Sequence, residues 1–254
     1  MALLENKVAV ITGAASGIGR QIALLYAEHG AHIVVADLQA ESREGGEPTH
    51  ELCEQRGGRA RYVQCDVTNL ANLENAVGAA EEFGGVDIMV NNAGVFRQHT
   101  FLEASEADFE QMMAVNVKGV YFGAQAAARR MVQKGGGVII NLSSVAGLQG
   151  TGGFTTYCAS KGAVRLFTYA LAQELGAQGV RVVALHPGLI DTDMTTEDVP
   201  IVGTEAGEGY LQMIPLNRWG KTEDVAKTAL YAASDLAAYV TGASLLIDGG
   251  MLRV

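Results

Sequence analysis

Short apolar runs rich in β-branched residues alternate along this chain with stretches of helical periodicity. Strands are expected at residues 8–12, 32–37, 61–65, 87–91, 138–142, 180–185 and 244–247, and helices at 18–29, 70–83, 105–133, 155–177 and 222–234. Because the strand runs are apolar at successive positions, they predict a parallel sheet covered by helices on both faces. The expected fold is therefore α/β: a single doubly wound domain over residues 1–254, with a mostly seven-stranded parallel sheet.

Two segments depart from this alternation. Gly45, Gly46 and Pro48 interrupt the helical pattern of residues 41–56. We therefore expect an irregular loop there, followed by a helix that begins near Pro48 or Thr49. Residues 194–213 have no firm pattern of either kind.

Bulk properties narrow the classes of partner. The chain of 254 residues has a formal net charge of −10 and 48% hydrophobic residues, which indicates a globular protein and argues against a nucleic-acid or anionic-membrane partner. Its three cysteines and five histidines have no metal-ligand spacing, so we expect reduced thiols and no metal site. The sequence has no signal segment and no apolar run long enough to span a bilayer, which favours a cytoplasmic location.

A glycine-rich turn lies between the first expected strand and the first expected helix. Gly13, Gly17 and Gly19 follow the strand in a G-x-x-x-G-x-G spacing. Glycines at such a turn let the backbone approach a pyrophosphate, and the helix N-terminus supplies N–H groups and partial positive charge. Tight packing between strand and helix is the alternative explanation for the same glycines.

Polar side chains follow the next strands. Asp37 ends the second strand eighteen residues beyond Gly19, where a carboxylate would bind adenosine ribose hydroxyls and repel a 2′-phosphate. Leu38 follows it where a basic residue would attract that phosphate, so the sequence favours NAD over NADP. A helix or turn cap is the alternative role for Asp37. Arg20 is a weak contrary sign, and we expect it to be solvated.

Two more polar groups follow later strands. Asp66 and Val67 end the third strand, where an adenine amino group could be bound, and residues 91–94, with the sequence Asn-Asn-Ala-Gly, end the fourth. Ligands of open α/β sheets bind outside the carboxyl ends of the strands. These side chains therefore predict one shared site at that edge of the sheet.

Tyr157 and Lys161 are four residues apart in an expected helix, so their side chains leave the same face. A cation held near the phenol favours the phenolate, and we expect it to lower the pKa of Tyr157 toward working pH. Such a pair is a candidate general acid/base for moving a proton on or off an alcohol oxygen. A solvated helix face is the alternative for the pair considered alone.

In their joint order and spacing these motifs resemble the short-chain dehydrogenase/reductase family, whose members have one Rossmann domain. The resemblance runs nearly end to end and rests on residues 12–19, Asp66, residues 91–94, Asn116, Ser144, Tyr157, Lys161, Pro187, Gly188, Thr192 and residues 248–250.

The resemblance implies a role for each catalytic candidate. It implies that Tyr157 is the acid/base and that Lys161 lowers its pKa and binds the nicotinamide ribose. It also implies that Ser144 donates to the substrate oxygen and that Asn116 holds a water in the proton relay. The cofactor-binding residues it implies are Gly13, Ser16, Gly17, Ile18, Gly19, Asp37, Leu38, Asp66, Val67, Asn92, Ala93, Gly94, Tyr157, Lys161, Pro187, Gly188, Ile190 and Thr192.

Family substrates bind over the tyrosine, under a flexible lid that corresponds to about residues 193–214 here. This segment contains no Lys or Arg, which disfavours anionic substrates, although Arg129 and Arg130 could form a basic spot elsewhere. The candidate substrate contacts are Ser144, Val145, Gln149, Phe154, Tyr157 and Met194, with Phe96 as a further pocket residue. They suggest a small to medium neutral molecule.

Three functions remain open from the sequence. The first is an NAD-dependent dehydrogenase of neutral secondary alcohols, such as cyclic alcohols, polyols or sugars. The second is a 3-oxoacyl or carbonyl reductase of the same family, and the third is a non-catalytic dinucleotide-binding scaffold. The family resemblance further implies a homotetramer.

Overall fold

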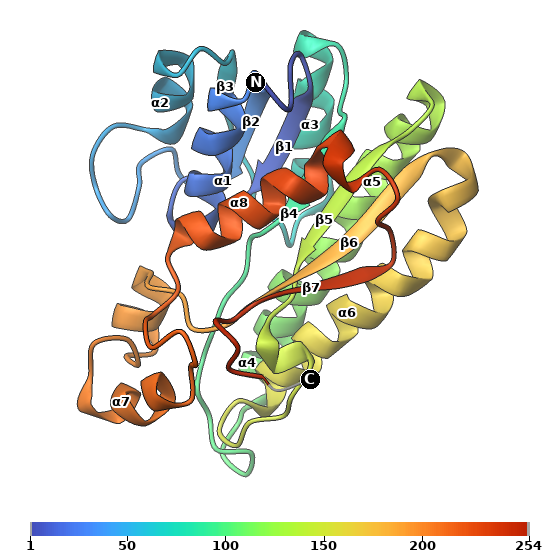
Figure 1. The fold of residues 1–254 in the computed structure, drawn as a ribbon. Coiled ribbons are helices and arrows are strands. Elements are labelled where there is room, and N and C mark those ends of the chain that lie inside the picture. The colour runs from blue at the N-terminus through green and yellow to red at the C-terminus, as the bar shows by residue number, and fades with distance from the viewer. Residues whose placement is uncertain (1, 253–254) are drawn as a thin grey trace.

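The structure, a computed structural model, describes residues 2–252 and contains a seven-stranded sheet in the order β3-β2-β1-β4-β5-β6-β7 (Figure 1). All six strand pairings are parallel. The strands are β1 (Val8–Thr12), β2 (His32–Asp37), β3 (Ala60–Gln64), β4 (Ile88–Asn91), β5 (Gly137–Leu142), β6 (Val180–Pro187) and β7 (Ala243–Ile247). The predicted doubly wound parallel sheet is confirmed.

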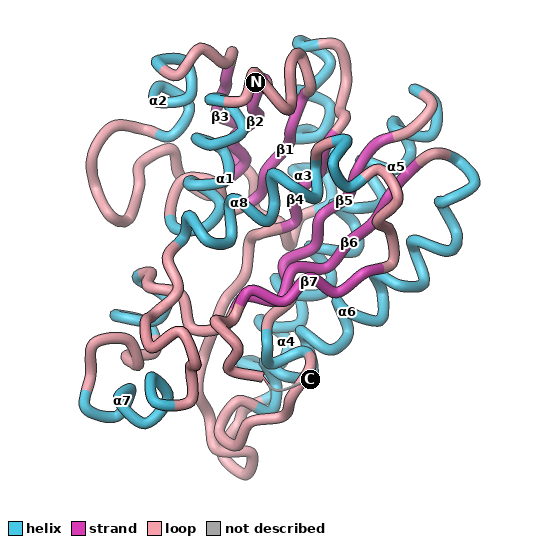
Figure 2. The backbone as a smooth tube through the Cα atoms, viewed as in Figure 1, coloured by secondary structure: helices cyan, strands magenta, loops and turns pink. Residues whose placement is uncertain are grey.

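Helices cover both faces of this sheet (Figure 1). One face carries α1 (Gly17–Glu28), α2 (Thr49–Gln55) and α8 (Thr222–Ala233), and the other carries α3 (Leu70–Gly78), α5 (Val120–Lys134) and α6 (Thr155–Leu175). Two helices, α4 (Glu106–Met113) and α7 (Glu205–Gln212), lie beyond the carboxyl ends of the strands, and α7 stands apart from the sheet among loops (Figure 2).

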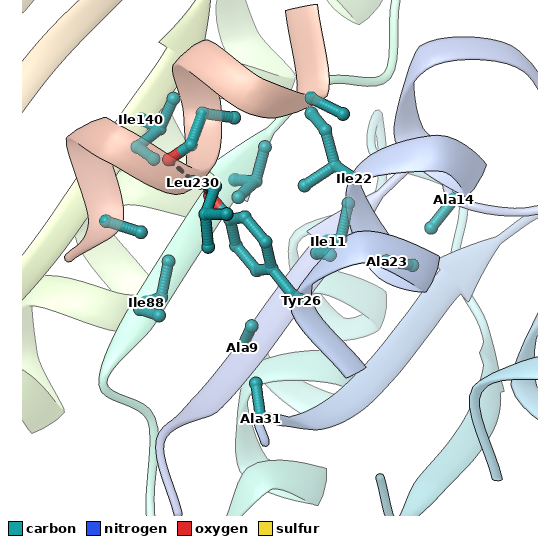
Figure 3. Close-up of a cluster of buried hydrophobic side chains, with 14 of the residues drawn as sticks. Ala9, Ile11, Ala14, Ile22, Ala23, Tyr26, Ala31, Ile88, Ile140 and Leu230 are labelled. Carbon is teal, nitrogen blue, oxygen red and sulfur yellow. Dashed lines mark hydrogen bonds between the residues drawn. The ribbon is translucent and has the colours of Figure 1, made fainter. Parts of the chain in front are cut away.

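The strand sequences explain why both faces need cover. Along β1, Ala9 and Ile11 enter one buried cluster, whereas Val8 and Val10 enter the cluster on the opposite face. Successive side chains of a strand point to opposite faces, so a strand that is apolar throughout can be buried only between two layers. Figure 3 shows the first cluster, in which the Tyr26 hydroxyl donates to the carbonyl of Ala229 at 2.8 Å and joins α1 to α8.

The segments without a regular pattern have defined structures. The 38–48 loop is irregular and α2 begins at Thr49, as predicted. The helix expected over 105–133 is instead α4 and α5 joined by a π-helical turn at Ala114–Gly119. Residues 194–213 are more ordered than expected, since they contain a π-helical turn at Met194–Asp198 and the helix α7.

The strand order places a crevice at the carboxyl edge of the sheet. From β1 the chain builds outward through β2 to β3, and it then returns to add β4 on the other side of β1. The loops that follow β1 and β4 therefore diverge, and in open α/β sheets this divergence leaves the ligand-binding crevice.

Candidate active site

A cavity of about 920 Å³ opens at this edge, lined by the loops that follow β1 to β6. Most of the residues singled out in the sequence line it, although they come from separate loops. They are Gly13, Ser16, Gly17, Ile18, Asp37, Leu38, Asp66, Val67, Asn92, Ala93, Gly94, Ser144, Val145, Phe154, Tyr157, Lys161, Pro187, Gly188, Ile190, Thr192 and Met194.

Three of the predicted residues do not line the cavity. Gly19 packs beneath the glycine turn, where an added Cβ would lie 2.1 Å from the carbonyl oxygen of Gly13. Asn116 is fully buried below the cavity wall. Gln149 is exposed and lies two residues beyond the 3-10 turn Val145–Gly147, and we no longer assign it as a substrate contact.

The glycine turn forms a cradle for an anion. Gly13 and Gly17 have positive φ angles of 64° and 56°, and a Cβ on Gly13 would lie 2.9 Å from the Cα of Ala93. The side chain of Ser16, at the N-cap of α1, makes no capping hydrogen bond. Instead, the N–H of Gly17 donates to the carboxylate of Glu44 at 2.7 Å. An anion is therefore already held at this helix N-terminus, and the site fits a dinucleotide pyrophosphate in the same place.

Glu44 belongs to the 38–48 loop, which folds back over the glycine turn. The backbone N–H of Arg43 donates to the Ser16 hydroxyl at 2.8 Å, and the Ser42 hydroxyl donates to Glu44 at 3.0 Å. These contacts hold the loop against the entrance of the anion site. The sequence did not indicate them, because Glu44 lies 27 positions from Gly17 in a glycine-rich loop.

We expect the Glu44→Gln variant to bind NAD about fivefold more tightly than the wild type. Two like charges about 5 Å apart repel by roughly 1 kcal/mol in water, and the substitution removes this repulsion while keeping the side-chain shape. Titration calorimetry with NAD would measure the change, and Glu47→Gln, on the same loop but outside the cavity lining, is the matched control. Weaker binding by Glu44→Gln would show that the carboxylate supports the cofactor site and does not compete for it.

Arg43 joins the 38–48 loop to the 193–214 segment. Its guanidinium donates to both carboxylate oxygens of Asp198, at 3.0 and 2.9 Å. It also lies 3.8 Å from Asp193 and 3.7 Å from Glu197. The hydrogen bond from Arg43 lowers the pKa of Asp198. Three of the five acidic residues of the segment are thus engaged by one cation from the opposite wall of the cavity.

Asp37 lies at the adenosine end of the cavity. One of its carboxylate oxygens accepts from the N–H of Ala15 at 2.8 Å, and the other accepts from the N–H of Leu38 at 2.7 Å. Burial raises the pKa of Asp37, and the two backbone hydrogen bonds oppose that shift. Each oxygen retains a lone pair, so the carboxylate is placed to accept from the hydroxyls of a ribose.

Arg20 differs from expectation because it is not simply solvated. Its guanidinium donates to the Thr49 hydroxyl at 3.0 Å and to the carbonyl of Glu47 at 2.9 Å. These bonds direct Arg20 toward the 38–48 loop, where it supports the start of α2. All of its hydrogen-bond acceptors are neutral, so the guanidinium keeps its positive charge on this side of the cavity.

Tyr157 and Lys161 lie one turn apart on α6, as expected, and both side chains reach the cavity. The ammonium of Lys161 donates to the carbonyl of Leu142 at 2.9 Å and lies 5.6 Å from the centroid of the Tyr157 ring. The Ser144 hydroxyl accepts from the N–H of Ala146 at 3.1 Å. Since that bond uses a lone pair, the hydroxyl keeps its own hydrogen for donation.

The prediction that the pKa of Tyr157 is lowered is wrong for the protein alone. Burial raises the pKa of Tyr157 to about 12, although hydrogen bonding by Ser144 opposes the shift. Burial also lowers the pKa of Lys161 to about 8. The physical reason is that the cation is turned to the carbonyl of Leu142, while both groups lose hydration in the same wall.

Asn116 fixes the cavity wall from below. Its side-chain oxygen accepts from the N–H of Val95 at 2.8 Å, and its amide donates to the carbonyl of Val95 at 2.9 Å and to the Ser160 hydroxyl at 3.2 Å. Both amide hydrogens are therefore donated to protein groups, while the side-chain oxygen keeps a second lone pair. That lone pair and the main chain of the π-helical turn are the places where Asn116 can hold a water.

Aromatic and aliphatic side chains surround the phenol. The ring of Phe96 stacks on Phe154 with centroids 4.9 Å apart and packs against Tyr157 at 4.6 Å. The lining also contains Gln111, Thr151 and Met251, which the sequence had not singled out, and Ile201 and Tyr210 from the predicted lid segment. They come from segments far apart in the chain, and only the fold brings them together.

Residues 2–252 contain no group of three or more His, Cys, Asp or Glu side chains arranged to hold a metal ion. Within the same residues, no helix is both long and apolar enough to cross a membrane.

Comparison with known proteins gives matches over nearly the whole chain. A family model described as Enoyl-(Acyl carrier protein) reductase matches residues 13–252. An L-2,3-butanediol dehydrogenase from Corynebacterium glutamicum is 42% identical over 97% of this chain and 99% of its own. The 3-oxoacyl-[acyl-carrier-protein] reductase FabG of Thermotoga maritima is 39% identical over 98% of this chain and 99% of its own.

Solved structures agree with the fold. A protein of Sinorhizobium meliloti, provisionally assigned as a short-chain alcohol dehydrogenase, has a TM-score of 0.92 and 38% identity, with 98% of each chain covered. A second, from Agrobacterium tumefaciens, is provisionally assigned as a 2-deoxy-d-gluconate 3-dehydrogenase and was crystallised with NADP. It has a TM-score of 0.89 and 35% identity, and covers 99% of this chain and 98% of its own.

Proposed function

The chain belongs to the short-chain dehydrogenase/reductase family and is an oxidoreductase, and from this premise we propose that it interconverts neutral secondary alcohols and ketones with NAD. The observation that carries the proposal is the cavity wall around Tyr157, where a phenol and the Ser144 hydroxyl meet beside aromatic side chains. Such a wall can orient a carbinol and exchange its proton, and it offers little to an anionic group.

A bound nicotinamide dinucleotide would supply the hydride acceptor or donor. We propose that it is held by the cofactor-binding residues named from the sequence, at the glycine turn and along the strand ends. Tyr157 then takes the carbinol proton or returns it, and Ser144 donates to the substrate oxygen. Lys161 supplies positive charge beside the phenol, and Asn116 holds the backbone of Val95 under the cavity.

The charges near the cavity favour a neutral substrate over a carrier-linked acyl group. The 193–214 segment, which we propose acts as a lid over the substrate, contributes acidic side chains and no Lys or Arg. The basic spot considered at Arg129 and Arg130 is balanced by two carboxylates, since both arginines pair with Glu74, at 3.3 and 2.9 Å, and Arg130 also lies 3.9 Å from Glu81. A partner with an acidic surface would find no unpaired cation at that spot.

A two-direction assay tests this function. The full chain would be given NAD with neutral diols, polyols, sugars and cyclic alcohols, and separately NADH or NADPH with 3-oxoacyl thioesters. We expect NADH formation with at least one class of neutral alcohol, at a higher kcat/KM than any thioester reduction. Faster thioester reduction would favour the 3-oxoacyl reductase alternative, and no turnover with any substrate would favour the non-catalytic scaffold.

Asp37 supports the preference for NAD over NADP, because its half-buried carboxylate would face a 2′-phosphate with like charge. The relative from Agrobacterium tumefaciens binds NADP, so the preference needs its own test. We expect Asp37→Ala to lower kcat/KM for NAD by about tenfold to hundredfold, the equivalent of one or two hydrogen bonds to a charged group. The same variant should gain activity with NADP. Equal use of both cofactors by the wild type would contradict the assignment.

We also propose that the chain acts as a homotetramer in the cytoplasm, as the family resemblance implies. Exposed apolar side chains support association, including Phe109 on α4, Tyr121 on α5 and Leu166 on α6, which are 47%, 45% and 67% exposed. Burying such side chains between copies would stabilise an assembly. Light scattering should then give a mass about four times the 26.6 kDa of one chain.

A further inference from the structure

His186 is a buried titratable residue for which the proposed chemistry has no role. It lies in β6 with 0% of its surface exposed. Its Nδ1 atom lies 2.9 Å from the carbonyl oxygen of Ser144, and its Nε2 atom lies 2.8 Å from the Ser244 hydroxyl. Both ring nitrogens are therefore engaged, and one of their partners belongs to the serine that faces the substrate.

The partners of His186 fix its tautomer. A carbonyl oxygen can only accept, so the ring must carry its hydrogen on Nδ1. Burial lowers the pKa of His186, and the cations of Arg165 and Lys161 lower it further against the opposing hydrogen bond to Ser144. A neutral ring with Nδ1–H has an acceptor at Nε2, so the Ser244 hydroxyl must donate to it.

The same logic extends the chain of hydrogen bonds to the catalytic helix. Because Ser244 donates to His186, its oxygen accepts from the Tyr169 hydroxyl, 2.5 Å away. The Tyr169 oxygen in turn accepts from Nε of Arg165 at 2.9 Å. All the donors then point one way, from α6 through β7 and β6 to the carbonyl of Ser144. Hydrogen bonds aligned in this way polarise and strengthen one another.

The row of hydrogen bonds ends at Ser144, whose hydroxyl must point toward the substrate oxygen. The Ser144 side chain accepts from the N–H of Ala146, and its carbonyl accepts from His186. These two contacts restrain both the backbone and the side chain of Ser144 at the start of the 3-10 turn. The remaining freedom of the residue, which lines the cavity, is the direction of its own O–H bond.

We propose that His186 is a positioning residue, which orients the Ser144 hydroxyl toward the substrate oxygen by holding the Ser144 carbonyl. The proposal rests on the proposed function in one respect, the role of Ser144 as donor to the substrate. His186 transfers no proton itself, since both nitrogens are engaged and the ring is closed to solvent. Its effect reaches the reaction only through Ser144.

Three single variants separate positioning from general packing. His186→Leu removes both ring contacts, whereas His186→Asn keeps an N–H donor close to the Nδ1 position. Ser244→Ala removes only the donor to Nε2. Displacing a reacting group by about 1 Å can lower the rate on the order of 100-fold. We therefore expect kcat of His186→Leu to be about 100-fold below wild type, and kcat of His186→Asn to be about tenfold above that of His186→Leu. The loss in Ser244→Ala should be smaller, and the Kd for NADH should stay within about twofold in all three.

A double-mutant cycle with Ser144→Ala gives the decisive comparison. If His186 acts through Ser144, adding His186→Leu to Ser144→Ala should cost little further activity. Losses that multiply, or a kcat that falls only together with weaker NADH binding and a lower melting temperature, would overturn the positioning role. Failure of His186→Asn to recover any kcat would also count against it.

The hydrogen-bond chain can be tested without any substrate. Nitrogen-15 NMR of histidine-labelled wild type should show His186 as the neutral Nδ1–H tautomer between pH 6 and 8, with Ser244→Ala shifting its Nε2 resonance. A charged His186 ring or the Nε2–H tautomer would contradict the proposed series of hydrogen bonds from Arg165 to Ser144. If the NMR spectra show these hydrogen bonds but no neutral alcohol is turned over, the proposed function has failed and the structural part of the inference stands.

Discussion

The Tyr157→Phe variant should lose turnover by about 10³-fold while it still binds NAD. The substitution removes one hydroxyl and leaves the ring packed against Phe96. General acid/base groups contribute roughly 10² to 10⁴ in rate. The pKa of Tyr157 is raised to about 12 in the protein alone, so the ring is neutral at neutral pH in both folded and unfolded chains. Its ionisation therefore contributes nothing to stability there.

The measurement pairs steady-state rates with calorimetric titration of NAD. We expect the Kd for NAD to change by less than about threefold, since the hydroxyl is one contact among many. Tyr231→Phe is the control, because Tyr231 lies on α8 and does not line the cavity. Turnover by Tyr157→Phe at the wild-type rate would remove Tyr157 from the proton transfer.

The Lys161→Met variant should also lose turnover, and it should change stability in a pH-dependent way. Lys161 is 4% exposed, and burial lowers its pKa from 10.5 to about 8. Below pH 8 both the folded and the unfolded chain hold this proton, and the buried charge costs about 3 kcal/mol. Between pH 8 and 10.5 the unfolded chain holds more protons than the folded one, so wild-type stability rises with pH in this window.

Methionine removes the buried charge but leaves the carbonyl of Leu142 without its donor, at a cost of about 1–3 kcal/mol. We therefore expect Lys161→Met to be slightly more stable than wild type at pH 7 and less stable near pH 10. Urea unfolding at both pH values measures the change, with Lys118→Met as a control for an exposed lysine. A stability difference that does not move with pH would show that Lys161 is not desolvated as described.

Much of the fold could be predicted because its determinants are local. Apolar runs such as His32–Asp37 gave the strand with its bounds, and Gly45, Gly46 and Pro48 gave the break before α2. Asp37, Tyr157 and Ser144 could be found because each stands at a strand end or on one helix face. The parallel sheet then brings such positions together at its carboxyl edge.

What the sequence could not give depends on contacts between distant segments. The pairing of Arg43 with Asp198 spans 155 positions, and neither residue has a local pattern that indicates its partner. The pKa of Tyr157 moved opposite to expectation, because spacing on a helix fixes the direction of a lysine but not its hydration or its hydrogen-bond partner. Gln149 was placed in the pocket by its nearness to Ser144 in the sequence, but it is exposed and does not line the cavity.

We propose that the protein oxidises a neutral carbinol in this cavity with Tyr157 as the proton carrier. The most direct measurement is the amount of ketone and of NADH formed from the best neutral alcohol, by wild type and by Tyr157→Phe at equal NAD occupancy. We expect equal amounts of ketone and NADH from the wild type, and neither above background from the variant. Ketone formation by the variant at the wild-type rate would contradict the claim, as would thioester reduction by the wild type that outpaces every neutral alcohol.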